Sequence, residues 1–440
     1  MIGVKICIIG AGLTGVSAAK NLPKGSYMVF EKEYDVGGLC GSEYINGFYF
    51  DYAPHAFFTS HVKILENVLK ALKNNVKKNL RRAYIYTHGK YVEYPLEVNL
   101  RMLPRDIAIE CLIGVIKALA SRTTPKNLKE WMYATYGEGI VRHYLEPYNR
   151  KLWKYDLEYM SADWVINRVP MPSIEDVVKG AFRKTGKRFG GNWCFYYPKK
   201  GGIKALVKAL ARDVKPIICN AEIIGIKPLN SCLRIRIRKD GKLKEMYFDK
   251  VINTAPLPDL VDSLNDTPSD VHKAAKDLKY NKLVTIGIGF KSRKDVKPHW
   301  IYYPEEKYPF NRVSYPVNFS KYTVPKGYSS LLAELTVESW REVYLEEEVE
   351  KVEQKLREAG AIPEDAQIIT RFCKTMKYAY VIYDLDYKKK INTIKDYLRE
   401  KGIITAGRYG EWAYLNMDHA IQAGERAAQT LINMREKRKA

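Results

Sequence analysis

The sequence predicts an α/β fold: a domain with a parallel sheet that binds a dinucleotide, into which a second, mixed α+β domain is inserted. Three observations carry this prediction. An apolar run over residues 4–9 leads into glycines at positions 10, 12 and 15. A second apolar run, residues 27–30, ends in an acidic residue. The chain has 440 residues, more than one hydrophobic core usually serves, and 46% of them are hydrophobic, as in a globular protein.

The first strand and the turn after it have the composition of a pyrophosphate-binding crossover. Gly10 permits the tight turn out of the strand, Gly12 lets backbone N–H groups approach a phosphate, and Gly15 lets the next helix pack close to the sheet. We expect the phosphate at the N-terminus of that helix, beside Leu13 and Thr14, where unpaired N–H groups and the helix dipole face it.

The second strand ends in Glu31, followed by Lys32, at the place where a carboxylate accepts hydrogen bonds from a ribose. An acid here favours an unphosphorylated ribose, as in FAD or NAD, over a ribose with a 2′-phosphate. Gly37, Gly38 and Leu39 follow in a loop. Adjacent glycines let backbone lie against a flat ring or a phosphate, and an ordinary turn is the alternative interpretation.

Periodicity gives the remaining elements in order. Alternating residues predict hairpins over 44–51, 83–94 and 233–247, with turns at Asn-Gly, His-Gly and Asp-Gly. Helical spacing predicts helices over 61–73, 203–212 and 337–360, and apolar runs predict buried strands over 249–256 and 283–290. The polar residues 170–195, with several glycines, predict a loop or flap. We assign residues 1–75, 196–275 and 386–440 to the dinucleotide-binding domain, and residues 76–195, largely helical, and 276–385, largely strands, to the substrate domain.

The bulk composition argues against several classes of protein. The net charge of +23 predicts attraction for anionic partners, but no basic block is interleaved with aromatic residues, so we expect no nucleic-acid binding. Seven scattered cysteines without paired metal-ligand spacing, and no basic-then-apolar leader, predict a cytoplasmic protein without disulfides or a metal. Residues 107–120 are the best membrane candidate, but they are too short to span a bilayer and carry two charges. We interpret them as a buried helix and expect no membrane association; an interfacial anchor is the alternative.

Glu31, the Gly37-Gly38-Leu39 loop and the segment from Asp51 to His55 (Asp-Tyr-Ala-Pro-His) together resemble the flavin-binding opening of the superfamily of amine oxidases, protoporphyrinogen oxidases and UDP-galactopyranose mutases. Ala53 stands where that family usually has glycine. The resemblance implies a Rossmann-type FAD-binding domain and places His55 near the flavin. The residues alone leave a structural hydrogen-bonding role for this histidine as the alternative.

The C-terminal segment carries a second part of the resemblance. Gly407 and Arg408 lie in a glycine-rich turn after a buried strand, and Met417 and Asp418 open the last helix. The resemblance implies that these four residues bind the cofactor. Asp418 would cap the helix whose N-terminus points at the flavin's ribityl-phosphate.

The aromatic-rich residues 133–153 and residues 161–170 resemble the substrate domain of UDP-galactopyranose mutases. In that family two arginines contact the diphosphate of a sugar nucleotide, and these positions fall on Arg168 and Arg312. Arginine suits this role because its planar fork holds two phosphate oxygens and stays charged. Taken alone, these arginines also fit surface ion pairs. The resemblance further implies substrate contacts from five polar side chains: Tyr94, Tyr303, Tyr315, Tyr414 and Asn416.

The activity that the resemblance implies is a flavin-dependent isomerisation between the pyranose and furanose forms of a nucleotide sugar. In the family, N5 of the reduced FAD attacks the anomeric carbon and expels the nucleoside diphosphate, so the protein has to hold the leaving group and exclude water. NAD(P)H is a candidate reductant for the flavin. The alternatives are an FAD-dependent oxidase or desaturase of the protoporphyrinogen or amine oxidase type, which needs an apolar cavity, and a flavin-binding protein without catalysis.

Overall fold

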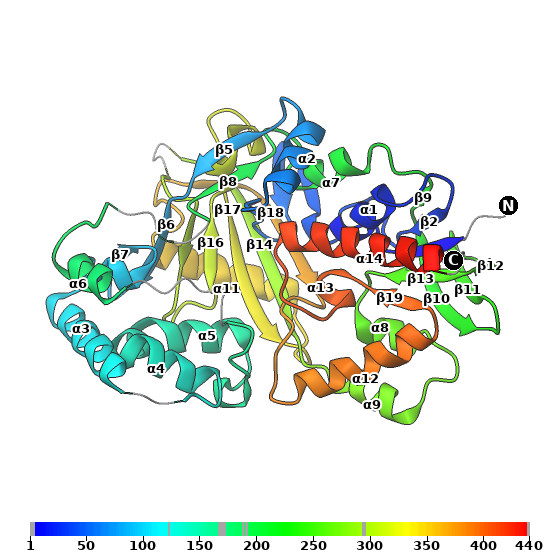
Figure 1. The fold of residues 1–440 in the computed structure, drawn as a ribbon. Helices are drawn as coiled ribbons and strands as arrows, with labels where there is room; N and C mark the ends of the chain where they lie inside the picture. Colours follow the sequence, from blue (N-terminus) through cyan, green and yellow to red (C-terminus); the bar gives the residue numbers. More distant parts are fainter. Residues whose placement is uncertain are drawn as a thin grey trace.

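The structure is a computed structural model that describes residues 5–121, 124–165, 173–186, 189, 192–292 and 296–437. Figure 1 shows the arrangement: the parallel sheet and its helices lie at the end of the molecule that carries both termini. A large mixed sheet lies in the middle, and a group of helices lies at the opposite end. Among the described residues, none of the helices combines the length and the apolar character needed to cross a membrane.

The first sheet is parallel and has the strand order β19-β13-β1-β2-β9. Its strands come from three separate parts of the chain: β1(Ile6–Ile9), β2(Tyr27–Phe30), β9(Ile217–Ile218), β13(Lys250–Asn253) and β19(Ile403–Thr405). Alternate side chains of β1 enter two different clusters, since Ile8 packs toward one face and Cys7 toward the other. Both faces of the sheet are therefore buried, which explains why β1 is apolar at every position.

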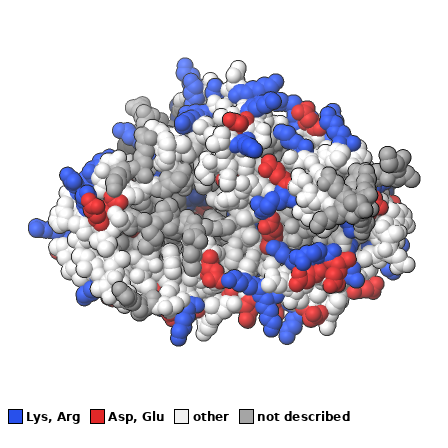
Figure 2. Space-filling view, in the orientation of Figure 1, with Lys and Arg blue, Asp and Glu red and all other residues white. Residues whose placement is uncertain are grey.

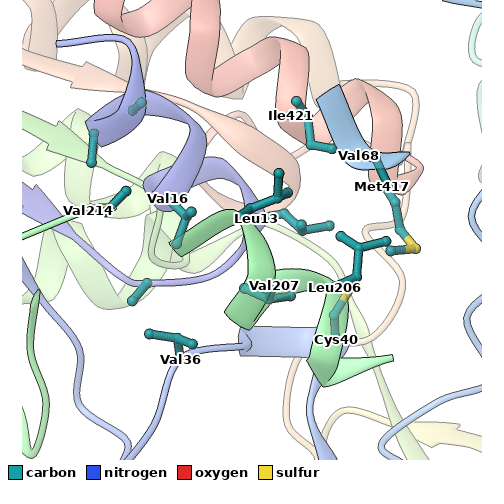
Figure 3. Packing of buried hydrophobic residues seen from close by; sticks show 14 of the residues in the cluster. Leu13, Val16, Val36, Cys40, Val68, Leu206, Val207, Val214, Met417 and Ile421 are labelled. Carbon is teal, nitrogen blue, oxygen red and sulfur yellow. The ribbon is translucent and has the colours of Figure 1, made fainter. Parts of the chain in front are cut away.

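Helices cover both faces of this sheet. One cluster contains α1(Leu13–Lys20), α2(Val62–Leu72), α7(Lys204–Ala211) and α14(Met417–Lys437). The other contains α8(Leu257–Asp262), α9(Ser269–Lys276), α12(Tyr387–Glu400) and the antiparallel strands β10(Ala221–Pro228), β11(Leu233–Lys239) and β12(Lys242–Phe248). Figure 3 shows α1 packing against α7 and α14 through Leu13, Val16, Leu206 and Ile421.

The second sheet has the order β18-β14-β17-β16-β15-β6-β7 and is antiparallel except where β15 runs parallel to β6. Its strands are β6(Ala83–Thr87), β7(Lys90–Glu93), β14(Asn281–Lys291), β15(Trp300–Tyr302), β16(Arg312–Ser314), β17(Ser329–Glu338) and β18(Gln367–Met376). One face packs on α11(Leu345–Glu358), the charged helix, which begins later than the predicted residue 337 because β17 extends to Glu338.

A helical layer completes the inserted part: α3(Arg105–Ala120), α4(Leu128–Ile140), the π-helix η4(Val141–Leu145), α5(Glu146–Trp153) and α6(Ile174–Phe182). Glycines let α3 and α4 cross closely, because a Cβ on Gly139 would lie 2.6 Å from the Cα of Cys111. Helix α3 is buried only on this side; Ile109, Ile113 and Ile116 are about half exposed. Helix α6 lies within residues 170–195, where the sequence predicted a loop, so that prediction was wrong for residues 174–182.

Short elements join these layers. They are the hairpin β3(Ser42–Ile45) and β4(Phe48–Asp51), the pair β5(Lys77–Leu80) and β8(Cys194–Tyr197), α10(Pro316–Phe319), α13(Gly407–Gly410), and the 3₁₀ turns η1(Gly38–Cys40), η2(Leu96–Val98), η3(Leu100–Met102), η5(Leu157–Tyr159) and η6(Lys321–Thr323). The predicted fold class is confirmed: a parallel dinucleotide-type sheet with an inserted mixed α+β part.

Candidate functional site

The glycine turn after β1 forms one wall of a cradle. Gly10 has φ +95°, and a Cβ on Gly15 would lie 1.9 Å from the carbonyl oxygen of Gly10, so both positions require glycine. Gly12 forms a bridge with Gly37, which brings the second glycine loop against the first. Gly37 and Gly38 both have positive φ. Gly12, Gly37 and Gly38 therefore lie side by side, so that a ligand can approach their backbone closely.

Glu31 lies at the end of β2 with only 6% of its surface exposed. Its carboxylate accepts hydrogen bonds from the backbone N–H of Ala11 (2.7 Å) and of Glu33 (3.0 Å). Burial raises the pKa of Glu31, and the two backbone bonds oppose that rise. The acid thus fixes the first glycine turn, and each of its oxygens retains capacity to accept a ribose hydroxyl. The neighbouring Lys32 is exposed.

The C-terminal segment closes against this cradle. Gly407 has φ +83°, and a Cβ there would meet the Oγ1 of Thr14 at 2.3 Å. Met417 is buried in the same cluster as Leu13, as Figure 3 shows. The first turn of α14 follows directly, and the Oδ1 of the buried Asp418 has no hydrogen-bond partner among the described residues.

Arg408 extends from this segment toward the second sheet. Its guanidinium donates to the carbonyl oxygens of Ala379 (2.7 Å) and Leu415 (3.3 Å) and lies over the rings of Tyr414 and Tyr380, 4.7 and 5.4 Å from their centroids. Its Nε is buried without a partner among the described residues. Buried polar atoms normally have partners. Asp418 Oδ1, which has His419 Nδ1 at 3.9 Å but no hydrogen bond, and Arg408 Nε lie beside a glycine cradle and fit a polar, hydroxyl-rich cofactor such as FAD.

Five tyrosines from separate parts of the chain cluster near Arg408. The ring of Tyr302 on β15 lies 5.4 Å from both Tyr94 and Tyr148, and Tyr380 stacks on Tyr414 at 5.8 Å. These five side chains keep partial exposure, in contrast to core residues. The five rings lie near one another and near Arg408 and Arg312; we call this set the tyrosine cage.

Arg312 on β16 lies in the cage and pairs across strands with Tyr302 and Glu334. Its Nη2 donates to the Oε1 of Glu334 at 2.8 Å, and its Nε donates to Oε2 of the same carboxylate. Glu334 has no exposed surface, whereas 22% of the Arg312 side chain is exposed. Despite burial, the carboxylate holds the pKa of Arg312 well above its usual range. One edge of a permanently charged guanidinium is thus fixed by an acid, and part of the Arg312 side chain stays exposed.

His55 lies near both arginines. Its Nδ1–H donates to the carbonyl of Ala53 at 2.7 Å, which leaves Nε2 as an acceptor. Burial, together with the charges of Arg408 and Arg312, lowers the pKa of His55 to about 4, although the hydrogen bond to Ala53 opposes the shift. The histidine is therefore neutral at physiological pH.

Lys151 fixes the loop between β15 and β16, which precedes Arg312. The buried ammonium group of Lys151 on α5 donates to the carbonyl oxygens of Tyr303 (2.8 Å) and Tyr308 (2.7 Å). On the cofactor side, the buried carboxylate of Asp51 accepts hydrogen bonds from Tyr197 (2.7 Å) and from the backbone N–H of Ile203 (3.0 Å). The Lys151 contacts join α5 to the β15–β16 loop. The Asp51 contacts join β4 to β8 and to the start of α7.

Comparisons with known proteins agree with this geometry. The model of the flavin containing amine oxidoreductase family matches residues 13–432. The chain belongs to this family. The match covers Glu31, the Gly37–Gly38 loop, the cage and the closing segment, so the flavoprotein family predicted from the sequence is confirmed.

Among curated proteins, the chain is similar to the 4,4'-diapophytoene desaturase (4,4'-diaponeurosporene-forming) of Staphylococcus aureus (strain COL), with 24% identity over 69% of this chain and 66% of that protein, just under two thirds of its length. Its fold is similar to that of a reduced UDP-galactopyranose mutase, with a TM-score of 0.91, 24% identity, and coverage of 99% of this chain and 95% of the other. A putative protoporphyrinogen oxidase from Exiguobacterium sp. 255-15 is less similar, with a TM-score of 0.72, 16% identity, and coverage of 98% and 99%. The predicted likeness to the mutase fold is confirmed.

The structure brings together several of the residues that the sequence suggested. Arg312, His55, Tyr94 and Tyr414 lie at the cage, and the carbonyl of Asn416 accepts the first hydrogen bond of α14, from Ala420 (2.9 Å). The cofactor-binding residues of the sequence prediction lie along the two glycine loops and the closing segment: Gly10, Gly12, Leu13, Thr14, Gly15, Glu31, Lys32, Gly37, Gly38, Leu39, Gly407, Arg408, Met417 and Asp418.

The structure does not bring Tyr303 and Tyr315 to the cage. Both are fully buried in the cluster between the second sheet and α11, and the hydroxyl of Tyr315 donates to the carbonyl of Ala361 (3.1 Å). Neither has exposed surface for a substrate. Arg168 lies outside the described residues.

Sequence reasoning missed Tyr302, Tyr380 and Glu334. Tyr302 and Tyr303 are adjacent in a short strand, where alternate side chains face opposite sides, so only the register decides which one reaches the site. Glu334 carried a usable signal, because it is an acid inside the otherwise apolar run of β17, and a buried acid needs a partner.

Proposed function

We propose that this protein is a flavin-dependent isomerase that interconverts the pyranose and furanose forms of a nucleotide sugar. The observation that carries the proposal is the pairing of Arg312 with Glu334 inside a tyrosine cage that also holds Arg408. An oxidase for an apolar substrate has no use for a buried, permanently charged group in its cavity. A diphosphate leaving group requires such a group.

The cofactor would be held by the two glycine loops, by Glu31 at a ribose and by the first turn of α14. When bound in its reduced form, the flavin supplies the nucleophilic chemistry at the sugar, and NAD(P)H is a candidate source of its electrons. The remaining tasks belong to side chains of this chain.

Arg312 would hold the diphosphate. As the bond between the anomeric carbon and the diphosphate oxygen breaks, negative charge develops on that oxygen, and hydrogen bonds from the guanidinium strengthen. Glu334 keeps one edge of Arg312 fixed, so the other edge is oriented before the substrate arrives. We propose the same diphosphate contact for Arg168, from the sequence resemblance.

The cage has two further roles in this proposal. Tyrosine rings exclude water, which would otherwise capture the open sugar, and their hydroxyls supply hydrogen bonds to sugar and phosphate oxygens. Neutral His55 contributes an acceptor without adding a third positive charge beside the two arginines.

Ring exchange tests the proposal directly. The purified protein is incubated with UDP-galactofuranose with and without dithionite, and the two ring forms are separated by chromatography. We expect conversion to UDP-galactopyranose only with dithionite. The similarity to a desaturase makes the other outcome specific: no conversion, together with flavin reduction by an apolar polyene or a porphyrinogen, would refute the isomerase and favour an oxidoreductase.

A further inference from the structure

The positive charge of this chain is concentrated in three stretches. Residues 67–92, 177–212 and 307–333 contain 21 Lys and Arg and no Asp or Glu, whereas the other 351 residues have a net charge of +2. Almost the whole net charge of +23 thus comes from 89 residues that are far apart in the sequence.

The fold brings one part of each stretch together. Strand β5 from the first stretch pairs with β8 from the second. Lys77 and Asn79 on β5 donate to the carbonyl oxygens of Asn318 (3.1 Å) and Phe319 (3.1 Å) in the third. The hydroxyl of Ser320 closes the set by donating to the carbonyl of Lys199 (2.6 Å). Figure 2 shows blue Lys and Arg side chains predominating along the upper edge of the molecule, over the place where Figure 1 draws β5.

A pocket of about 350 Å³ opens beside β5. Three basic residues line it, Arg81, Arg82 and Lys184, against one acid, Glu93, which lies 3.4 Å from Lys184. Arg81 is fixed, since it donates to Asn192 and Phe189. Arg82 is exposed, and no described carboxylate lies within salt-bridge distance of it.

The pocket shares a wall with the tyrosine cage. Tyr94 lines the pocket, and the guanidinium of Arg81 lies 5.0 Å from its ring centroid. On its other side Tyr94 contacts Tyr302, the cross-strand partner of Arg312. A ligand in the pocket is therefore separated from the proposed diphosphate site by two tyrosine rings.

We define the basic face as the described Lys and Arg residues of the three stretches 67–92, 177–212 and 307–333. We propose that this basic face steers an anionic nucleotide to the pocket, and that Arg82 and Lys184 receive its diphosphate on the way into the cage. The choice of ligand rests on the proposed function. The steering rests on the charge distribution: a surface of one sign around an opening raises the local concentration of an oppositely charged ligand and its association rate.

The size of the effect follows from Coulomb's law. A single positive charge about 10 Å from a doubly negative diphosphate in water favours the encounter about fourfold, and 0.5 M salt screens nearly all of this attraction. Neutralising two such charges is expected to slow association about tenfold at low salt. Dissociation, which starts from the cage, is expected to stay unchanged.

Stopped-flow fluorescence with UDP as the probe measures both rates. The test variant is Arg82→Ser with Lys184→Ser. The control is Lys242→Ser with Lys244→Ser, two exposed lysines on β12 at the other end of the molecule, so both variants lose the same net charge. We expect association about tenfold slower at 10 mM salt for the test variant, less than twofold slower at 0.5 M salt, and less than twofold slower for the control at both. Uncharged uridine should associate equally fast with all three proteins.

Three results would overturn the inference: equal slowing in both variants, no slowing in either, or faster UDP dissociation from the test variant, which would make the pocket part of the bound site. Binding of UDP without ring exchange refutes the proposed function and leaves the steering measurement intact. Failure of UDP to bind at all would overturn both.

Discussion

Replacement of Arg312 by methionine is the most direct test of the site. Arg312 is the only described partner of the buried Glu334 carboxylate among the ion pairs, so the substitution has a structural cost as well as a catalytic one. Removing one member of a buried pair leaves an uncompensated charge and costs about 3–5 kcal/mol. The catalytic loss comes from two charge-assisted hydrogen bonds to the diphosphate, each worth roughly 1.5–3 kcal/mol, or about 10²- to 10⁴-fold in kcat/KM together.

A second variant separates these two effects. In Arg312→Met with Glu334→Leu, no charge is left buried, and apolar replacement of a buried pair is often neutral for stability. We expect the double variant to unfold in urea within about 2 kcal/mol of the wild type while ring exchange stays at least 100-fold slower. Arg371→Met is the matched control, because Arg371 forms an exposed pair with Glu353 (2.8 Å) and should change stability by less than about 1 kcal/mol and activity not at all.

The assay is chromatographic separation of the two ring forms under dithionite, with flavin absorbance as the check on folding. If the double variant binds flavin and still exchanges ring forms within about fivefold of the wild type, Arg312 does not hold the leaving group and the reasoning fails.

Three further predictions concern Gly15, Asp51 and His55. Gly15→Ala places a Cβ 1.9 Å from the carbonyl oxygen of Gly10, so the purified variant should contain little flavin. The ratio of absorbance at about 450 nm to absorbance at about 280 nm measures the flavin content. Burial raises the pKa of Asp51 to about 6, above its unfolded value, so the fold loses stability as pH rises from 4 through 6. Relative to Asp51→Asn, the wild type should gain about 2 kcal/mol in urea unfolding as pH falls from 6 to 4. The pKa of His55 is lowered to about 4, below its unfolded value, so the wild type should lose about 3 kcal/mol relative to His55→Gln as pH falls from 6.5 to 4. A constant difference between wild type and variant across these ranges would contradict either assignment.

The cofactor cradle was predictable because its signals are local. The glycines at 10, 12 and 15 each answer a requirement of one turn, and that turn lies between a strand and a helix that the sequence also indicates. Glu31 was predictable for the same reason, since its position at the end of β2 follows from the length of one crossover.

The cage was only partly predictable because it is assembled from strands that meet through long-range pairing. The chain has 33 tyrosines, and nothing in the spacing of Tyr302, Tyr380 or Tyr414 distinguishes these three from tyrosines in the core. The choice between Tyr302 and Tyr303 depends on the register of β15 with β16, which pairs Tyr302 with Arg312. A shift of one residue would have exchanged their roles.

The arrangement of charge indicates that attracting the ligand and holding it are tasks of different residues. Arg312 is neutralised at short range by Glu334, so it projects little field beyond the cage. We expect long-range attraction to come mainly from the basic face around Arg82, where Glu93 is the single acid among the described residues that line the pocket. Raising salt should accordingly lower kcat/KM, because substrate association slows. It should leave kcat unchanged, because the paired charges inside the cage are shielded from solvent ions. A kcat that falls together with kcat/KM as salt rises would show that this division of tasks is wrong.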